Sequence, residues 1–213
     1  MNLKEEAYEM LKDRILNGVY LPGQMLNEKS IIEELGISRT PFREAINALS
    51  KENLVDIYPR RGMFVTEITL KDVSDLYGMR KILEPFAVRL AFPNIPPTVL
   101  TELKGKLENF SEKSYDQIVR EDEDLHSMIL RYADNTYLSR MMEQLYEHNK
   151  RVRVFSTRSE EDVRITISQH QVILDALIAG DVERAVKEME QHIDTSRERA
   201  FHHIFANKSF IVR

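Results

Sequence analysis

The sequence predicts a mainly α-helical protein in which a small head of helices and strands precedes a larger all-helical body. Segments rich in β-forming residues occur only within residues 1–69, whereas long amphipathic helical patterns fill residues 70–213. The hydrophobic fraction of 42% over 213 residues is enough to bury a real core. We therefore expect two domains, 1–69 and 70–213.

Composition narrows the classes of partner and site. The formal net charge is −5, so DNA binding would require a local cationic surface. The absence of cysteine excludes disulfides, thiolate metal sites and cysteine nucleophiles. No apolar run approaches the roughly 20 residues that span a bilayer, and the acidic start MNLKEEAYEM is unlike a signal peptide. We expect a cytoplasmic protein with no membrane partner.

Two helices are expected at the start of the head. Residues 3–17 place apolar side chains near one helical face, and Gly18 ends this helix. A second, short helix begins after Asn27, which is suited to the N-cap position, and Gly36 supplies its C-terminal stop.

The stretch GISRTPFREAI, residues 36–46, begins a third helix. Ser38 can cap this helix, and Pro41 falls in its first turn, where no N–H bond is lost. We expect the helix to end near Lys51. The following stretch LVDIYPRRGMFVTEI is typical of a β-hairpin with its turn at residues 59–62.

The second and third helices, joined by a tight turn at Gly36, have the pattern of a helix-turn-helix. Arg39, Thr40 and Arg43 lie on the outer N-terminal part of the third helix, which enters the DNA major groove in this motif. Arginine suits bidentate contact with guanine and also binds phosphate. The alternative is a solvated helix whose arginines form surface salt bridges. The inward face has apolar residues at i, i+3, i+4 and i+7, namely Phe42, Ala45, Ile46 and Leu49.

Further cationic groups flank the third helix. Lys29, early in the second helix, is placed to contact the neighbouring DNA backbone. The hairpin tip with Arg60 and Arg61 would form a cationic wing beside the groove, and Gly62 would give its turn the necessary backbone freedom. The head is therefore predicted to be a winged helix-turn-helix domain.

The body is expected to form an antiparallel bundle of about six helices, because the connections between them are short. Asp122 and His126 are four residues apart on one helix face, and His170 and His192 lie on the apolar faces of two other helices. Such ligands in a bundle core would suit Zn²⁺, Ni²⁺, Fe²⁺ or Mn²⁺, and the residue types do not select among them. The alternative is three core histidines without a metal.

The head resembles a known family. The stretch GVYLPGQMLNEKSIIEELGISRTPFREAINALSKENLVDIYPRRGMFV is similar to the winged helix-turn-helix domain of GntR-type bacterial transcription regulators. Asn53 stands where the family commonly has glycine, and asparagine also tolerates left-handed backbone. With this resemblance, the candidate DNA-binding residues are Lys29, Ser38, Arg39, Thr40, Arg43, Arg61 and Gly62.

The body resembles the FCD ligand-binding domain of the FadR branch of GntR regulators, and its helix count is closest to the VanR-like subgroup. Metal-binding members carry one aspartate and three histidines, so the resemblance implies a divalent metal ion as cofactor. Leu125 stands where phenylalanine is usual, and Gln169 where a glutamate often precedes the histidine, a change that would weaken support of that ligand. The matching positions are Asp122, His126, His170 and His192.

A metal held by four protein ligands keeps coordination positions for water or a metabolite carboxylate when it is octahedral. Arg80 is the candidate effector-binding residue, since its fork of donors matches a carboxylate. The alternative for Arg80 is an i,i+4 ion pair with Glu84, and both roles can hold together.

The expected function is that of a transcription regulator, a repressor rather than an enzyme. A homodimer would bind a palindromic operator in double-stranded DNA, and a small organic acid bound at the metal would control its affinity. The competing function is a metal-dependent hydrolase with an accessory DNA-binding head, in which a metal-bound water would be the nucleophile. A third possibility is an architectural dimer with an empty body.

Overall fold

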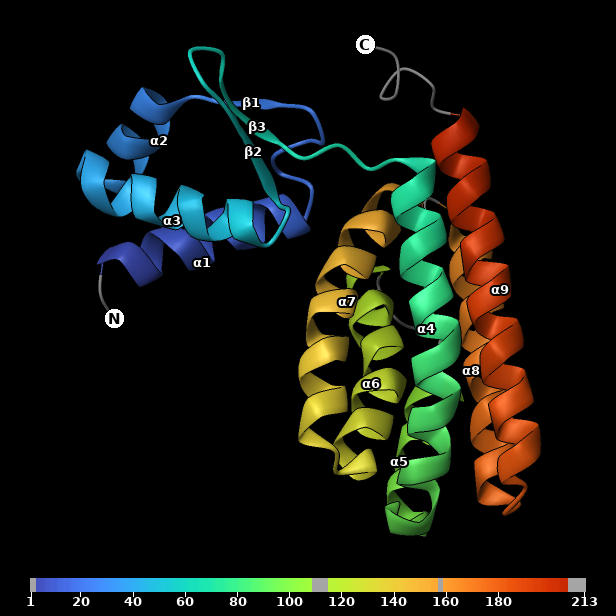
Figure 1. Ribbon diagram of the computed structural model, residues 1–213. Coiled ribbons are helices and arrows are strands. Elements are labelled where there is room, and N and C mark those ends of the chain that lie inside the picture. Colours follow the sequence, from blue (N-terminus) through green and yellow to red (C-terminus); the bar gives the residue numbers. More distant parts are fainter. Residues whose placement is uncertain (1–2, 109–114, 157–158, 207–213) are drawn as a thin grey trace.

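The computed structural model describes residues 3–108, 115–156 and 159–206, with the backbone alone for residues 115–123. Figure 1 shows a small head beside the upper end of a taller bundle of helices. Each part has its own hydrophobic core, formed by residues between Ala7 and Val65 in the head and between Val73 and Ile204 in the body. The expected mainly α-helical fold class is confirmed.

The head combines three helices with a small antiparallel sheet of order β1-β3-β2. The expected hairpin, β2 with β3, is confirmed. Strand β1 is missed by sequence reasoning, because a strand of two residues is defined by its pairing with β3 and has no periodic pattern of its own. The elements are α1 (Leu3–Leu16), β1 (Met25–Leu26), α2 (Glu28–Leu35), α3 (Arg39–Lys51), β2 (Val55–Tyr58) and β3 (Gly62–Val65).

Local interactions set the ends of α2 and α3. Asn27 caps α2 by accepting a hydrogen bond from the Ser30 N–H at 3.0 Å, and Gly36 ends it in left-handed backbone with φ of 63°. Ser38 holds the N-cap position of α3, but its side chain makes no capping hydrogen bond with the described residues. Asn53 has φ of 56°, the left-handed conformation expected of a residue that replaces glycine.

The predicted inward face of α3 is confirmed, because all four of its apolar residues are buried. They pack in the head core with Leu11 and Ile15 of α1. Burying each of the larger side chains contributes roughly 1.5–3 kcal/mol, so this face fixes the rotation of α3 about its axis. The opposite face of α3, with its arginines, is thereby held in solvent. The buried residues are Phe42, Ala45, Ile46 and Leu49.

The body contains six α-helices within the described residues, in agreement with the expected number. Capping boxes start two of them, with Thr69 and Asp72 at α4 and Ser159 and Asp162 at α8. No helix in the described ranges is both long and apolar enough to cross a membrane. The elements are α4 (Leu70–Ala91), the 3₁₀ turn η1 (Phe92–Asn94), α5 (Pro97–Glu108), α6 (Tyr115–Ala133), α7 (Thr136–Ser156), α8 (Glu160–Ile178) and α9 (Val182–Ala206).

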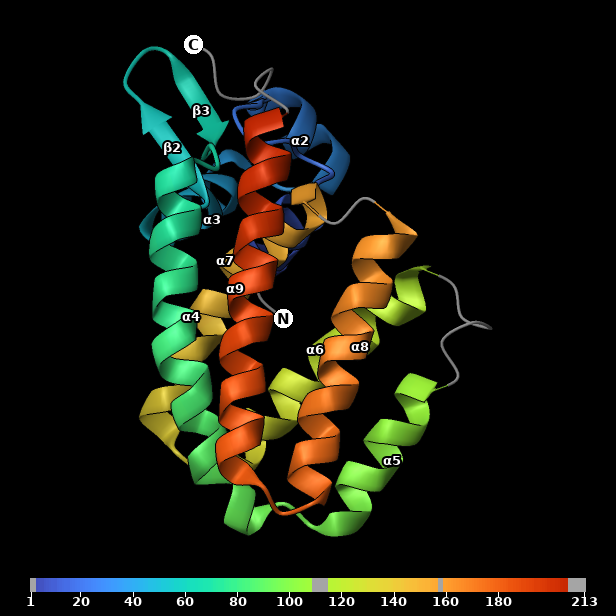
Figure 2. The same ribbon diagram turned by 90° about the vertical axis from the view of Figure 1, so that its right-hand side faces the viewer.

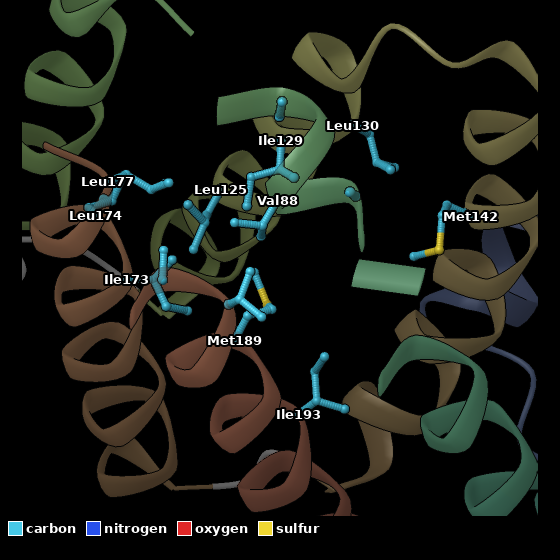
Figure 3. Packing of buried hydrophobic residues seen from close by; sticks show 14 of the residues in the cluster. Val88, Leu125, Ile129, Leu130, Met142, Ile173, Leu174, Leu177, Met189 and Ile193 are labelled. Carbon is cyan, nitrogen blue, oxygen red and sulfur yellow. The ribbon is translucent and has the colours of Figure 1, made fainter. Parts of the chain in front are cut away.

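A dry layer of aliphatic side chains binds the body helices together. Figure 3 shows side chains of four helices converging, among them Val88 of α4, Leu125 of α6, Ile173 of α8 and Met189 of α9. All four are fully buried. Because α6, α8 and α9 also carry the three predicted metal-binding histidines, this packing sets the distances among those rings.

The head meets the body where α1 lies against α7. The Lys12 ammonium lies 2.7 Å from a carboxylate oxygen of Glu147 on α7 and 3.0 Å from one of Glu52 in the head. A Cβ atom on Gly18 would stand 2.9 Å from Val154 Cγ1, so the end of α1 and α7 approach each other closely. In addition, Arg151 of α7 donates a hydrogen bond to the Thr66 carbonyl, just before α4 begins.

Candidate metal centre and DNA interface

Three buried histidines from three helices meet in the interior of the body. His126 of α6, His170 of α8 and His192 of α9 are at most 8% exposed. The Nε2 atoms of His170 and His192 are 3.4 Å apart, and the ring centroid of His126 lies 5.1 and 5.3 Å from those of the other two. One nitrogen of each ring lies within 4.8 Å of the others, so a small side-chain movement would bring all three onto one ion.

Two neighbouring side chains orient these rings. Glu84 Oε2 lies 2.7 Å from His126 Nδ1, and Gln169 Oε1 lies 3.1 Å from His192 Nδ1. An acceptor beside Nδ1 favours the proton there and leaves Nε2 with its lone pair directed inward. Gln169, although it replaces the glutamate often found at this position, thus retains an acceptor, and the ring that it contacts is that of His192 rather than that of the adjacent His170.

Glu84 is 1% exposed and forms the centre of a buried chain of charges. Its Oε1 lies 2.5 Å from Arg80 Nε, and Arg80 Nη1 donates to Asn149 Oδ1 at 2.8 Å. Burial raises the pKa of Glu84, but Arg80 and His126 outweigh that effect and bring the pKa down to about 2. We call Arg80, Glu84 and His126 the buried ion chain.

The histidine cluster has the chemistry of a cation site. Burial lowers the pKa of His192 well below its usual value, and His170 and His126 lower it further, so the ring is neutral near pH 7. Neutral imidazoles whose lone pairs face a shared space fit a divalent transition metal. The predicted fourth ligand, Asp122, lies on α6 one turn before His126, but its side chain is outside the described residues.

A cavity of about 380 Å³ adjoins the histidine cluster. Its wall includes His126 and His192 from the cluster, and it reaches Leu16 at the end of α1 in the head. The cavity therefore touches both the histidine cluster and the head. The other lining side chains within the described residues come from α4, α6, α7, α8 and α9: Tyr77, Arg80, Ser127, Glu143, Tyr146, Glu147, Asn149, Lys150, Arg153, Ser156, Thr166, Ser196 and Arg199.

Of the two roles that the sequence predicts for Arg80, the ion pair is confirmed. Arg80 forms the i,i+4 ion pair with Glu84, and it also lines the cavity. Because Nε and Nη1 already donate to Glu84 and Asn149, the guanidinium has less capacity for a second carboxylate than the sequence suggested.

The candidate DNA-binding side chains gather on one exposed side of the head. The side chains of Lys29, Arg39 and Arg43 are 86%, 81% and 64% exposed, and among the described residues both arginines have only the Glu28 carboxylate within 4 Å, at 3.9 and 3.5 Å. One acidic group therefore faces two guanidinium groups, which leaves a cationic surface. Ser38 and Thr40 are also exposed at the start of α3.

The hairpin tip forms a second cationic region on the surface of the head. Figure 1 shows the β2–β3 turn as the protruding wing above the helices. Arg61 is exposed, with its guanidinium 5.6 Å from the centroid of the Tyr58 ring. Gly62 has φ of 112°, which confirms its expected role in the turn, and Arg60 is also left-handed with φ of 64°.

Comparison with known families accounts for both parts of the chain. The model of the bacterial regulatory proteins of the gntR family matches residues 3–65, and that of the FCD domain matches residues 75–195, more than half of the sequence. The chain belongs to the GntR family and carries an FCD domain. This GntR protein is accordingly a DNA-binding transcription regulator, as its head and body geometry indicated.

Individual relatives and structures support this assignment. The GntR chain is 26% identical over 202 residues to the uncharacterized HTH-type transcriptional regulator YdhC of Bacillus subtilis, covering 92% of this chain and 90% of YdhC. It is 27% identical over 209 residues to the gluconate operon transcriptional repressor of the same species, covering 91% and 82%. The solved structure of McbR/YncC from Escherichia coli superposes with a TM-score of 0.77 and 25% identity, covering 95% and 98%.

Sequence reasoning brought the three histidines together and named Gln169 as a supporting group, but it missed the contact of Glu84 with His126. Glu84 entered only as a partner of Arg80, because the contact between α4 and His126 of α6 is tertiary and has no local signal. The helical pattern of residues 3–17 places Leu16 near the apolar face of its helix. Nothing in that pattern indicates that Leu16 faces a cavity in the other domain. Its position depends on how α1 docks on α7.

The substitution Glu84→Gln should lower the free energy of unfolding by about 3–5 kcal/mol, because it leaves the Arg80 charge buried without its counter-charge. Urea unfolding followed by circular dichroism measures the loss. As a control, Glu183→Gln removes the exposed partner of Arg89 and should change stability far less, because solvent screens that pair. Equal effects of the two substitutions would contradict the role given to the buried ion chain.

Proposed function

We propose that this protein is a repressor whose affinity for its operator is controlled by a small organic acid bound at a metal ion in the body. Residues 1–69 act as the reading head and residues 70–213 as the sensor. The observation that carries this proposal is the cavity that joins the histidine cluster to Leu16 of the head. A ligand in that cavity would touch both domains at once.

The metal is proposed to be held by one carboxylate and three imidazoles. His126, His170 and His192 would supply imidazole nitrogens, and Asp122 would supply the fourth ligand. A divalent ion such as Zn²⁺, Ni²⁺, Fe²⁺ or Mn²⁺ would provide a Lewis acid on which a carboxylate can bind. The cavity adjoins the cluster, so an acid bound there could reach the metal ion. Arg80, which also lines the cavity, would donate a further hydrogen bond to the acid.

DNA recognition is proposed to be divided between base and phosphate contacts. Arg39 and Arg43 would reach guanine edges in the major groove, with Ser38 and Thr40 beside them, while Lys29 and the wing at Arg61 and Gly62 contact the backbone. Their exposure and their position on one side of the head support these roles. A homodimer would place two heads on the two halves of a palindrome.

The names of relatives support repression and an acidic effector. The relative from the gluconate operon is named as a repressor, and gluconate is a hydroxylated carboxylic acid. A hydrolase is less well supported. Glu84, the carboxylate that contacts the histidine cluster, is held by Arg80 and His126, and its pKa of about 2 makes it a poor general base.

The α7 helix offers a route from the cavity to the head. Glu147 lines the cavity and also forms the ion pair with Lys12 of α1. An acid that shifts α7 toward itself, or that displaces the Glu147 carboxylate from Lys12, would therefore alter how α1 packs on α7. Such a change alters operator affinity only if the acid binds the two arrangements with different affinities.

The direct experiment measures operator affinity with and without metal and a panel of small organic acids. The operator is first selected from random DNA with the purified full chain, and binding is followed by fluorescence anisotropy. At least one acid should change the dissociation constant by about 5-fold or more, and only with the metal present. If no acid in a broad panel changes it, the proposed sensor function is wrong.

Substitution of Arg43 tests the reading head separately. Arg43→Ala should cost about 1–3 kcal/mol on the selected operator, while the metal content of the protein stays unchanged. Arg140→Ala, on the exposed surface of α7, is the matched control and should leave operator affinity as it was. Equal weakening on all DNA sequences would instead make Arg43 a phosphate contact.

Substitution of Lys12 tests the route through α7. Lys12→Met removes the ion pair with Glu147 and should reduce the acid-induced change in operator affinity at least about threefold, with metal and acid binding retained. Lys4→Met is the control, since Lys4 pairs with Glu44 within the head. A full response in the Lys12 variant would show that the α1–α7 contact does not carry the signal.

A further inference from the structure

The charge of the cavity wall is not balanced by its own residues. Four cationic side chains line the cavity in the described part of the chain, against two carboxylates, Glu143 and Glu147. Glu147 is paired with Lys12, which is not part of the wall. The cationic lining residues are Arg80, Lys150, Arg153 and Arg199.

These cations differ in how far they are neutralised. Arg80 has a buried counter-charge in Glu84. Lys150, which is half-buried, makes no ion pair or hydrogen bond with any described residue. Arg199 is held by neutral acceptors, since it donates to the Asp162 carbonyl and to hydroxyl groups. A half-buried cation without a carboxylate partner favours an anionic ligand, because little water remains to screen its charge.

Lys150 and Arg199 lie away from the histidine cluster, toward the head. His192, Ser196 and Arg199 share one face of α9 at i, i+4 and i+7, so Arg199 is about 10 Å further along the helix axis than His192. On α7, Tyr146 lies beside His126, with ring centroids 5.8 Å apart, and Arg153 follows seven residues later. Figure 1 shows α7 and α9 running in the same direction, upward toward the head.

The cavity therefore has two ends of different chemistry. The lower end is the histidine cluster, where a metal would take one carboxylate. The upper end carries Arg199, Arg153 and Lys150, and α1 reaches the same cavity through Leu16. Polar groups that suit a hydroxylated chain are part of the same wall: Ser127, Asn149, Thr166 and Ser196.

We propose that the effector is a dianion: a hydroxylated acid with one carboxylate for the metal and a second acidic group for the cationic end formed by Lys150, Arg153 and Arg199. A volume of about 380 Å³ lies at the small end of the range of ligand pockets, which suits a short acid. This inference rests on the proposed function, to which it adds the class of acid. The second acidic group is then the part of the ligand that lies nearest the head.

The test compares pairs of acids of equal chain length that differ in a single terminal group. Isothermal titration of the metal-loaded full chain would use succinate against butyrate, tartrate against threonate, and galactarate against galactonate. In at least one pair the dianion should bind about tenfold more tightly or better, because a charge-assisted contact is gained at the far end. The advantage should shrink as salt is raised.

Two variants assign the effect to the cationic end. Lys150→Met should bring the ratio of the two affinities close to one while the affinity for the monoanion and the metal content stay unchanged. Arg199→Gln should also bring the ratio of dianion to monoanion affinity closer to one. Lys187→Met removes an exposed lysine from α9 outside the cavity and should leave the ratio intact.

The outcomes separate this inference from the function on which it rests. If monoanions bind as tightly as dianions in every pair, the proposal of a second acidic group is wrong, whereas the proposed metal-dependent sensor function is unaffected. A dianion preference that survives in both Lys150→Met and Arg199→Gln would also overturn the assignment to this end. If no acid binds and none changes operator affinity, the proposed function itself fails.

Discussion

The buried ion chain is the constraint on which the interior of the body depends. Two charged side chains, Arg80 and Glu84, are enclosed in a helical bundle where a lone charge would cost several kcal/mol. They are tolerated because each satisfies the other, and because the second carboxylate oxygen of Glu84 faces His126. The pair therefore contributes little to stability, and its main effect is to hold the His126 imidazole in one orientation.

This orientation connects the fold to the proposed chemistry. The Nδ1 of His126 faces Glu84 and the Nδ1 of His192 faces Gln169, while the Nε2 of His192 lies 3.4 Å from that of His170. The rings are brought together by the aliphatic layer shown in Figure 3, which ties α4, α6, α8 and α9 to one another. Figure 2 shows α4 and α9 side by side along most of their length, so Arg80, Glu84 and His192 lie on two helices that pack against each other.

The sequence was informative wherever a pattern is local. Periodicity predicted the inward face of α3, and the turn chemistry of Asn27, Gly36 and Asn53 is as expected. The three histidines could be grouped because His170 and His192 lie on the apolar faces of their helices and His126 shares a helix face with Asp122. By contrast, β1, the contact of Glu84 with His126 and the position of Leu16 each depend on the meeting of distant segments, for which no single stretch of sequence carries a signal.

The most direct measurement is a crystal structure of the purified full chain with anomalous diffraction data collected at transition-metal absorption edges. The account predicts one anomalous peak between the inward nitrogens of His126, His170 and His192, with the Asp122 carboxylate as a further ligand and the cavity beside it open to an acid. Three imidazoles hydrogen-bonded to one another with no peak among them, in protein purified without chelator, would contradict it.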